Sequence, residues 1–267
     1  MLRLSALYRY PLKSGKAEVL QQIGLDRLGL EGDRRWMLVD EASGRFLTQR
    51  AVAKMSQLTA LWNTEGGLTL SAPGYGTLDV ALPGADVLRG VTIWHDTLRV
   101  PDAGDAAAAW VSAFIGKPTR LVHMPMDRAR FTQHGFGHDS DQVGFADGYP
   151  LLLIGQASLD DLCTHIGRPM HMLRFRPNLV IEGAEAFAED GWKRLRIGAV
   201  EFRVVKSCSR CILTTVDPQT GERSPDREPF ATLQAYRGTE QGAMFGQNLV
   251  NDGVGRLEVG MPVTVLE

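Results

Sequence analysis

Glycine interrupts this chain unusually often, and the apolar stretches between the glycines and other turn-forming residues are short. Glycine accounts for 29 of the 267 residues, about 11% against an average near 7% in globular proteins. Short apolar runs bounded by turn residues are typical of β-strands. The sequence therefore predicts a mainly β fold with a few helices (α+β), and the chain is long enough to bury a core without covalent cross-links.

Strand-like runs fill most of the first hundred residues, with turns between them. We expect strands at 2–8, 35–40, 45–48, 57–62, 68–71, 91–94 and 97–100. Residues 41–44 and 95–96 are expected to form tight hairpin turns. At 105–115 apolar side chains recur at intervals of three and four residues, which predicts a helix that ends at Gly116.

The second half continues this mixture after a long polar loop. Residues 131–148 are glycine-rich and polar, and loops of this length are often functional. Ser158 begins a capping-box pattern, so we expect a helix over 159–166. Further strands are expected at 178–181, 194–197, 201–205, 212–216, 256–259 and 262–266, with a short helix over 229–236. We therefore expect two β-rich domains, at residues 1–125 and 126–267.

Charge and hydropathy argue against several classes of protein. Lys and Arg number 29 against 31 Asp and Glu, a net charge of -2, whereas nucleic-acid-binding domains usually carry a basic excess. Residues 1–11 contain two arginines and lack the apolar core of a signal peptide. No run approaches the roughly 18 apolar residues of a membrane span. We therefore expect a cytoplasmic protein with reduced thiols that binds neither nucleic acid nor membranes.

The cysteines are few, and each needs its own explanation. Cys163, Cys208 and Cys211 are too few for a disulfide-rich scaffold, a four-cysteine zinc site or an iron–sulfur cluster held by cysteines alone. Cys163 falls on the apolar face of the helix expected over 159–166, so we expect it in the core. Cys208 and Cys211 lie in the segment 206–211, between two strand-like runs.

Three interpretations of Cys208 and Cys211 compete. A thioredoxin-type redox motif would open a helix, but Ile212 begins a β-branched, strand-like run. Half of a zinc site would need further ligands such as His134 and His138. Two buried thiols acting as small apolar side chains are the simplest alternative. A flanking lysine and arginine favour the thiolate form, which binds metals or attacks substrates, so the residues indicate a reactive or metal-ligating cysteine.

Longer motifs connect the chain to a known family. They are Phe-Arg-Pro-Asn-Leu-Val at 175–180, Glu-Asp-Gly-Trp at 189–192, Cys-Ser-Arg-Cys-Ile-Leu-Thr-Thr-Val-Asp-Pro at 208–218 and Phe-Gly-Gln at 245–247. These motifs resemble the MOSC domain, the C-terminal domain of molybdenum cofactor sulfurases. Tyr-Pro-Leu-Lys-Ser at 10–14 and Gly-Asp-Arg-Arg-Trp at 32–36 resemble the N-terminal β-barrel domain that precedes MOSC. The whole chain resembles the mitochondrial amidoxime-reducing component and its bacterial relatives, which implies two β-barrel domains with a cofactor site between them.

The resemblance implies a pterin-bound molybdenum cofactor. Cys211 occupies the position of the family's metal ligand and Asp147 that of an aspartate near the metal, which implies a catalytic role for both. The residues at the family's cofactor-binding positions are Lys13, Ser14, Arg34, Arg176, Asn178, Ser209 and Arg210. Such side chains supply charge-assisted and directional hydrogen bonds to a phosphate and a pterin. Gly148 and Tyr149 depart from the family's pattern, because its mitochondrial members carry small hydroxyl residues there.

Strand geometry adds two expectations about these residues. Arg34 is followed directly by Arg35, and alternation along a strand allows only one of them to face the site. Arg176 and Asn178 are two residues apart, so in a strand both would face the same side. That arrangement suits a shared ligand.

The resemblance also implies a reductase of N-hydroxylated compounds, namely hydroxylamines, amidoximes and N-hydroxylated bases. No nucleotide-binding or flavin motif is present, so the electrons are expected from a separate ferredoxin or reductase. The alternative is a molybdenum cofactor carrier or sulfur-transfer module without reductase activity. No pyridoxal phosphate domain is expected, because the two domains already occupy the chain. A zinc protein that uses the cysteine pair and histidines is a third hypothesis.

Overall fold

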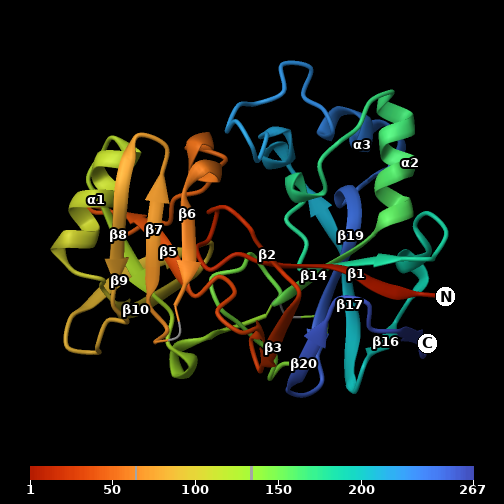
Figure 1. Cartoon of the computed structure of the whole chain (residues 1–267), viewed down its shortest axis with the longest axis horizontal. Helices are drawn as coiled ribbons and strands as arrows, with labels where there is room; N and C mark the ends of the chain where they lie inside the picture. Colours follow the sequence, from red (N-terminus) through yellow and green to blue (C-terminus); the bar gives the residue numbers. More distant parts are fainter. Residues whose placement is uncertain (64, 133–134) are drawn as a thin grey trace.

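Two β-rich lobes lie side by side in the computed structural model, which describes residues 1–63, 65–132 and 135–267. In Figure 1, helix α1 flanks the first lobe, whereas α2 and α3 flank the second. Strands outnumber helices in both lobes. The mainly β class with a few helices is therefore confirmed.

A nine-stranded sheet organises the second lobe. Its path runs β2, β1, β15, β14, β19, β17, β16 and β21, and β18 pairs with β19. The strands are β1 (Arg3–Arg9), β2 (Glu18–Leu20), β14 (Leu151–Gly155), β15 (Leu179–Glu182), β16 (Arg194–Ile197), β17 (Val200–Arg210), β18 (Gly238–Thr239), β19 (Gly242–Asn251) and β21 (Val263–Val265). Although β1 comes from the start of the chain, it pairs antiparallel with β15, with Leu7 opposite Leu179. The opening residues therefore belong to the sheet of the second lobe.

Over the residues that the structure describes, the strand pairings of these β-barrel-type lobes form open paths and do not close into complete rings. Strand β14, which the sequence pattern missed, lies inside the large sheet between β15 and β19. Leu151 and Leu153 enter one core cluster, whereas Leu152 and Ile154 enter another. A strand buried on both faces is a continuous apolar run. A search for alternating apolar and polar residues does not detect such a strand.

Smaller sheets and one helix build the first lobe. Its elements are β5 (Trp36–Asp40), β6 (Thr59–Trp62), β7 (Leu68–Ala72), β8 (Tyr75–Val80), β9 (Leu88–Ile93), β10 (Asp96–Pro101), α1 (Asp105–Ile115) and β11 (Thr119–His123). The pairings are β6 with β7 and β8, β9 with β10, and β5 with β11. Helix α1 has the predicted bounds, and its Val111 and Phe114 are buried against this lobe's core. The strand expected at 45–48 is wrong, because Arg45 and Phe46 form only isolated bridges.

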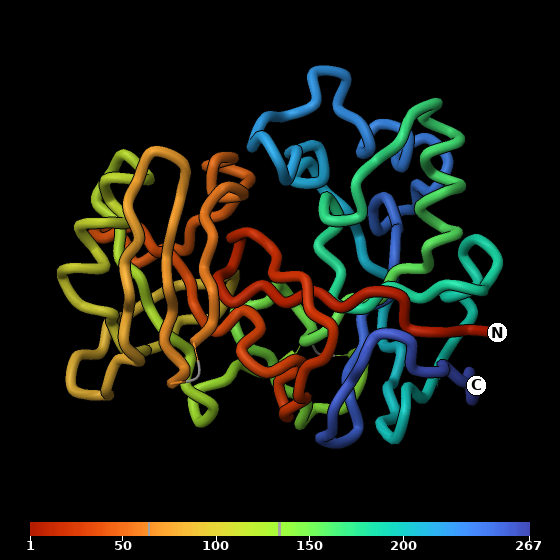
Figure 2. Tube along the Cα trace, in the orientation of Figure 1, coloured from red at the N-terminus to blue at the C-terminus, as the bar shows by residue number. Residues whose placement is uncertain are grey.

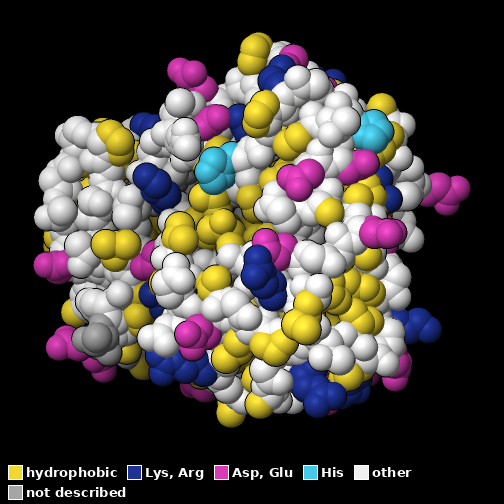
Figure 3. Space-filling view, turned by 45° about the vertical axis from the view of Figure 1, so that its right-hand side comes forward, with side chains coloured by type: hydrophobic (Ala, Val, Ile, Leu, Met, Phe, Trp, Pro, Cys, Tyr) yellow, Lys and Arg dark blue, Asp and Glu magenta, His cyan; other side chains and the backbone are white. Residues whose placement is uncertain are grey.

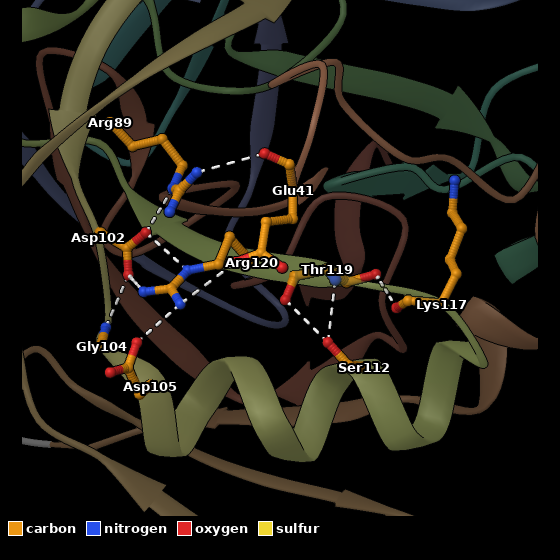
Figure 4. A network of polar contacts seen from close by, with 9 residues as sticks. All are labelled: Glu41, Arg89, Asp102, Gly104, Asp105, Ser112, Lys117, Thr119 and Arg120. Carbon is orange, nitrogen blue, oxygen red and sulfur yellow. Dashed lines mark hydrogen bonds and ion pairs between the residues drawn. The ribbon is translucent and has the colours of Figure 1, made fainter.

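A buried carboxylate ties three elements of the first lobe together (Figure 4). The Asp102 side chain, only 1% exposed, accepts hydrogen bonds from Arg89 Nε at 2.6 Å and from Arg120 Nη2 at 2.5 Å. The Asp102 carboxylate also accepts a hydrogen bond from the backbone N–H of Gly104 at 2.8 Å. Arg120 also donates to Asp105 at the start of α1, at 2.8 Å. These contacts neutralise the buried charge and fasten β9, β11 and α1 to the segment after β10.

Among the residues that the structure describes, a three-stranded and a two-stranded sheet complete the fold, with α2, α3 and five short 3-10 helices. They comprise β3 (Gln22–Asp26), β4 (Gly29–Leu30), β12 (Arg130–Phe131), β13 (Gln142–Val143), β20 (Gly255–Glu258), α2 (Gln156–Ile166), α3 (Phe230–Tyr236), and 3-10 turns η1 (Ala53–Gln57), η2 (Met126–Arg128), η3 (Met172–Arg174), η4 (Ala188–Gly191) and η5 (Ile212–Thr215). β20 pairs with β3 near the start of the chain. Both termini lie at the outer edge of the second lobe (Figure 2), where the N–H of Val263 donates to the carbonyl of Leu2.

Two local predictions in this lobe are wrong. Helix α2 begins at Gln156, so Ser158 lies inside its first turn and donates instead to Glu189, at 2.8 Å. The segment expected as a strand over 212–216 forms η5. The hydroxyls of Thr214 and Thr215 donate to backbone carbonyls three residues earlier, and such side-chain bonds compete with sheet pairing.

The surface carries charges of both signs. On the face shown in Figure 3, acidic and basic side chains are interspersed, in keeping with the net charge of -2. Over the described residues, none of the helices combines the length and the apolar character needed to cross a bilayer.

Candidate functional site

One pocket brings together all nine residues that the sequence singled out. Its wall includes Lys13, Ser14, Arg34, Asp147, Arg176, Asn178, Ser209, Arg210 and Cys211. They come from the loop after β1, the turn before β5, the segment before β14, the approach to β15 and the end of β17. Thr48 and Arg50 of the first lobe complete the wall, so the pocket lies where the two lobes meet. This placement agrees with the predicted site between the lobes, while the role of each residue stays a prediction.

Unusual backbone conformations direct several of these side chains into the pocket. Ser14, Arg34 and Arg176 have φ angles of 62°, 47° and 56°, in the left-handed region that favours glycine. Non-glycine residues rarely adopt this region, and where they do the surrounding structure must hold them there. Three of the six such residues in the described chain thus lie around this one pocket.

Arg34 and Asn178 form the hydrogen-bonded floor of the pocket. Arg34 donates from Nη1 to Asn178 Oδ1 at 2.9 Å and from Nη2 to the Arg176 carbonyl at 3.1 Å. The guanidinium groups of Arg34 and Arg176 lie 4.3 Å and 4.1 Å from the ring centroid of Tyr10. Asn178 also accepts from the N–H of Leu152 at 3.1 Å, which fixes its side chain to β14.

The residues predicted to face the site do so, but the strand alternation given as the reason is wrong. Arg35 turns away from the pocket and donates to Asp26 at 2.5 Å, so only Arg34 faces the site. Arg176 and Asn178 both line the pocket. However, Arg34 lies in a turn and β15 begins only at Leu179, so left-handed turn conformations orient these residues, not strand alternation.

Asp147 lies between two cations at the pocket wall. Its carboxylate pairs with Lys13 through one oxygen and with Arg50 through the other, at 3.3 Å for Arg50 Nη2. Desolvation alone would raise the pKa of the Asp147 carboxyl, but the charges of Lys13 and Arg50 outweigh it and hold this pKa below its ordinary value. Asp147 is therefore ionised at neutral pH.

Lys13 is a buried cation with a perturbed proton affinity. Lys13 is only 4% exposed, and its Nζ donates to the carbonyl of Phe145 at 2.7 Å. Burial lowers the pKa of Lys13 to about 8, although Asp147 opposes this shift. Lys13 is thus able to give up and regain a proton near neutral pH, next to an ionised carboxylate.

The three cysteines have different surroundings. Cys211 follows β17 and lines the pocket, where its sulfur accepts a hydrogen bond from Arg50 Nε at 3.2 Å. Cys208 also lines the pocket, accepts from Arg210 Nη1 at 2.9 Å and packs against a core cluster. Cys163 packs against the same cluster on α2 and accepts from the N–H of Met170 at 3.2 Å. The packing predicted for Cys163 is confirmed, whereas Cys208 both packs against the core cluster and lines the pocket.

The zinc hypothesis gains no support from the described residues. They contain no group of three or more His, Cys, Asp or Glu side chains placed to hold a metal ion. His138 is exposed and does not line the pocket, and His134 lies outside the described residues.

The pocket is suited to an anionic ligand. Its wall carries Lys13, Arg34, Arg50, Arg176 and Arg210 against the single carboxylate of Asp147. Nη2 of Arg176 and Nε of Arg210 are buried and donate to no partner in the described part of the chain. Buried donors without partners are costly, and guanidinium groups bind phosphate-like anions through charge-assisted hydrogen bonds. A thiol on the same wall adds a ligand for soft or higher-valent metals.

Arg50 and Thr48 are pocket residues that sequence reasoning missed. Thr48 is the last residue of the strand expected at 45–48, and Arg50 lies two residues further on. Arg50 reaches Cys211 across 161 positions of sequence. In the sequence, Arg50 is marked only by its place after a short apolar run. Arginines in such places are common on protein surfaces, so this pattern does not predict a pocket residue.

Comparison with known proteins identifies the family. The family model described as the MOSC N-terminal beta barrel domain matches residues 1–118, and the MOSC domain model matches residues 140–264. Mitochondrial amidoxime-reducing component 1 of Homo sapiens is 32% identical over 98% of this chain and 82% of its own length. The Mus musculus and Danio rerio proteins of the same name are 35% and 34% identical, and each aligns with at least 97% of this chain. The chain therefore belongs to the family that joins a MOSC N-terminal domain to a MOSC domain, with the mitochondrial amidoxime-reducing components among its relatives.

Proposed function

We propose that this protein is a molybdenum-cofactor-dependent reductase of N-hydroxylated compounds. The observation that carries the proposal is a free thiol, Cys211, on the wall of a strongly cationic pocket, in a chain related to amidoxime-reducing components. Hydroxylamines, amidoximes and N-hydroxylated bases are the substrates we propose. A separate electron-donor protein, such as a ferredoxin or a reductase, would supply the electrons.

The donor set of the pocket fits such a cofactor. Cys211 offers the thiolate that would bind the metal. The unpaired donors of Arg176 and Arg210, with the buried amide of Asn178, fit the phosphate and the polar ring edges of a pterin. Lys13, Ser14, Arg34 and Ser209 would complete this binding surface. When bound, the group would supply the two-electron chemistry that breaks an N–O bond.

The side chains of the pocket would handle the protons. Reduction of an N–OH group to N–H and water consumes two electrons and two protons. The ionised carboxylate of Asp147 can accept a hydrogen bond from the hydroxyl or amine of a substrate. Lys13, in contact with Asp147 and with its pKa at about 8, can release a proton toward the departing oxygen and recover it from solvent. Arg34 and Asn178 would keep the site in shape during this exchange.

Metal analysis and turnover test the proposal together. We would express the protein in a host that makes the cofactor, measure molybdenum and zinc by mass spectrometry, and assay hydroxylamine reduction with a chemical electron donor. We expect molybdenum near one atom per chain and loss of activity in Cys211→Ala. The matched control is Cys163→Ala, because Cys163 lies on α2 outside the pocket.

Other outcomes would point elsewhere. Full activity of Cys211→Ala would refute the proposal. Retention and exchange of molybdenum cofactor without turnover would favour the alternative of a carrier or sulfur-transfer module. Zinc without molybdenum would favour a zinc protein. A cytoplasmic location, with no nucleic-acid or membrane partner, stays a prediction that cell fractionation can test.

A further inference from the structure

Arg50 occupies a position in the pocket that the family resemblance did not assign. Its side chain comes from the first lobe, is 30% exposed and reaches both candidate catalytic residues. Nε donates to the Cys211 sulfur at 3.2 Å, and Nη2 donates to Asp147 at 3.3 Å. The guanidinium also lies 4.9 Å from the ring centroid of Trp94, which holds it from another direction.

These contacts leave part of the guanidinium available. The group carries five N–H donors in a rigid plane, and Nη1 donates to no partner within the described part of the chain. An arginine guanidinium stays protonated in proteins, so this charge is permanent. A charged group that can still donate hydrogen bonds is therefore held beside the Cys211 sulfur.

We propose that Arg50 is the substrate-binding residue that recognises the oxygen atom carried on the substrate's nitrogen. This inference rests on the proposed function, because the reacting oxygen must approach whatever Cys211 binds. Arg50 donates to both the Cys211 sulfur and the Asp147 carboxylate, so an oxygen that comes between these two groups meets the guanidinium. Asp147, which accepts a hydrogen bond from the same guanidinium, is placed to accept a hydrogen bond from the substrate's hydroxyl group. A hydroxyl on nitrogen, which both donates and accepts, matches this pair of groups, whereas the reduced amine lacks the oxygen that Arg50 would bind.

A ligand pair that differs by one atom tests this role without turnover. Phenylhydroxylamine and aniline are both uncharged at neutral pH and differ only in the oxygen. We would measure the Kd of each for the oxidised, cofactor-loaded protein without an electron donor, in anaerobic buffer. Wild type is expected to bind phenylhydroxylamine about tenfold more tightly, the effect of one charge-assisted hydrogen bond. Arg50→Gln is expected to bring the ratio of the two Kd values close to one.

Two further variants and one further measurement complete the design. Arg45→Gln is the matched control, since Arg45 is exposed and lies outside the pocket, and it should keep the wild-type ratio. Arg50→Lys keeps the charge but not the planar fork, and should give an intermediate ratio even if Arg50→Gln folds poorly. Molybdenum content, measured for every variant, ensures that occupied sites are compared. An unchanged ratio in both Arg50 variants, or a wild type that does not distinguish the ligands, would overturn the inference.

The proposed function can fail separately. If wild type binds phenylhydroxylamine preferentially but does not reduce it when electrons are supplied, the reductase is refuted while the role of Arg50 in oxygen recognition is supported. If wild type reduces hydroxylamines and Arg50→Gln keeps the preference for the oxygenated ligand, the reductase stands and the inference about Arg50 is refuted.

Discussion

Replacing Asp102 by Asn is expected to destabilise the first lobe strongly without changing the pocket. The carboxylate is 1% exposed and accepts hydrogen bonds from Arg89 at 2.6 Å and from Arg120 at 3.0 and 2.5 Å (Figure 4). The amide removes the negative charge and leaves the Arg120 side chain, 10% exposed, without its main counter-ion. Removing one partner of a buried ion pair costs about 3–5 kcal/mol. We expect a loss of this size in the free energy of unfolding.

Urea unfolding followed by tryptophan fluorescence measures this loss, with an unchanged slope against urea as the sign that only stability has changed. Asp79→Asn is the control, because Asp79 is exposed and bonds only to Thr69 among the described residues. Burial raises the pKa of Asp102, but Arg120 and Arg89 outweigh it and the net pKa is lowered. The wild-type advantage should therefore be present above the ordinary carboxyl pKa and disappear as the pH falls through the lowered value. A loss below about 1 kcal/mol, typical of exposed pairs, would refute the reasoning.

Three further predictions concern the pocket and the core. Lys13→Met removes the buried cation that pairs with Asp147, and should raise the Kd for the cofactor about tenfold, as expected for one charge-assisted contact, so that less molybdenum is retained on dilution, as measured by mass spectrometry. Asn178→Leu leaves the buried N–H of Leu152 without its side-chain acceptor, and should cost about 1–3 kcal/mol in urea unfolding. Burial and the charge of Arg35 lower the pKa of His123 from 6.5 to about 4, so the unfolded chain binds the proton more tightly. Wild type should therefore lose up to about 3 kcal/mol as the pH falls from 6.5 to 4, and His123→Phe should lose less over this range.

Local sequence patterns located the three α-helices and most strands of the large sheet, such as β1, β15 and β16, but missed β14 and β19 in its interior. Helix α1 was placed at its observed bounds, since its apolar spacing and terminal Gly116 are local signals. Strand β14 was missed because it is apolar on both faces. η5 was missed because β-branched residues favour strands in general, whereas the hydroxyls of Thr214 and Thr215 bond to the local backbone here. Propensity alone does not include such competition.

The pocket residues that lie in family motifs could be predicted from the sequence. The family motifs contained every residue proposed to hold the cofactor, and the fold brings these residues to one wall. Arg50 could not be found in this way, because its importance arises only when the two lobes meet and its guanidinium reaches Cys211 and Asp147. Contacts between distant parts of the chain are not encoded in the spacing of neighbouring residues.

The pairing of β1 with the second lobe explains how residues so far apart in sequence form one pocket. The N–H of Tyr8 donates to the carbonyl of Asn178 at 2.9 Å, and the Asn178 side chain returns a hydrogen bond to the carbonyl of Tyr8 at 3.1 Å. Lys13 lies a few residues after β1, and Arg34 donates to the same Asn178. Removing β1 would therefore break strand pairing within the sheet of the second lobe as well as contacts that shape the pocket. A site assembled in this way keeps its cations at fixed positions before any ligand arrives, and such preorganisation lowers the cost of binding.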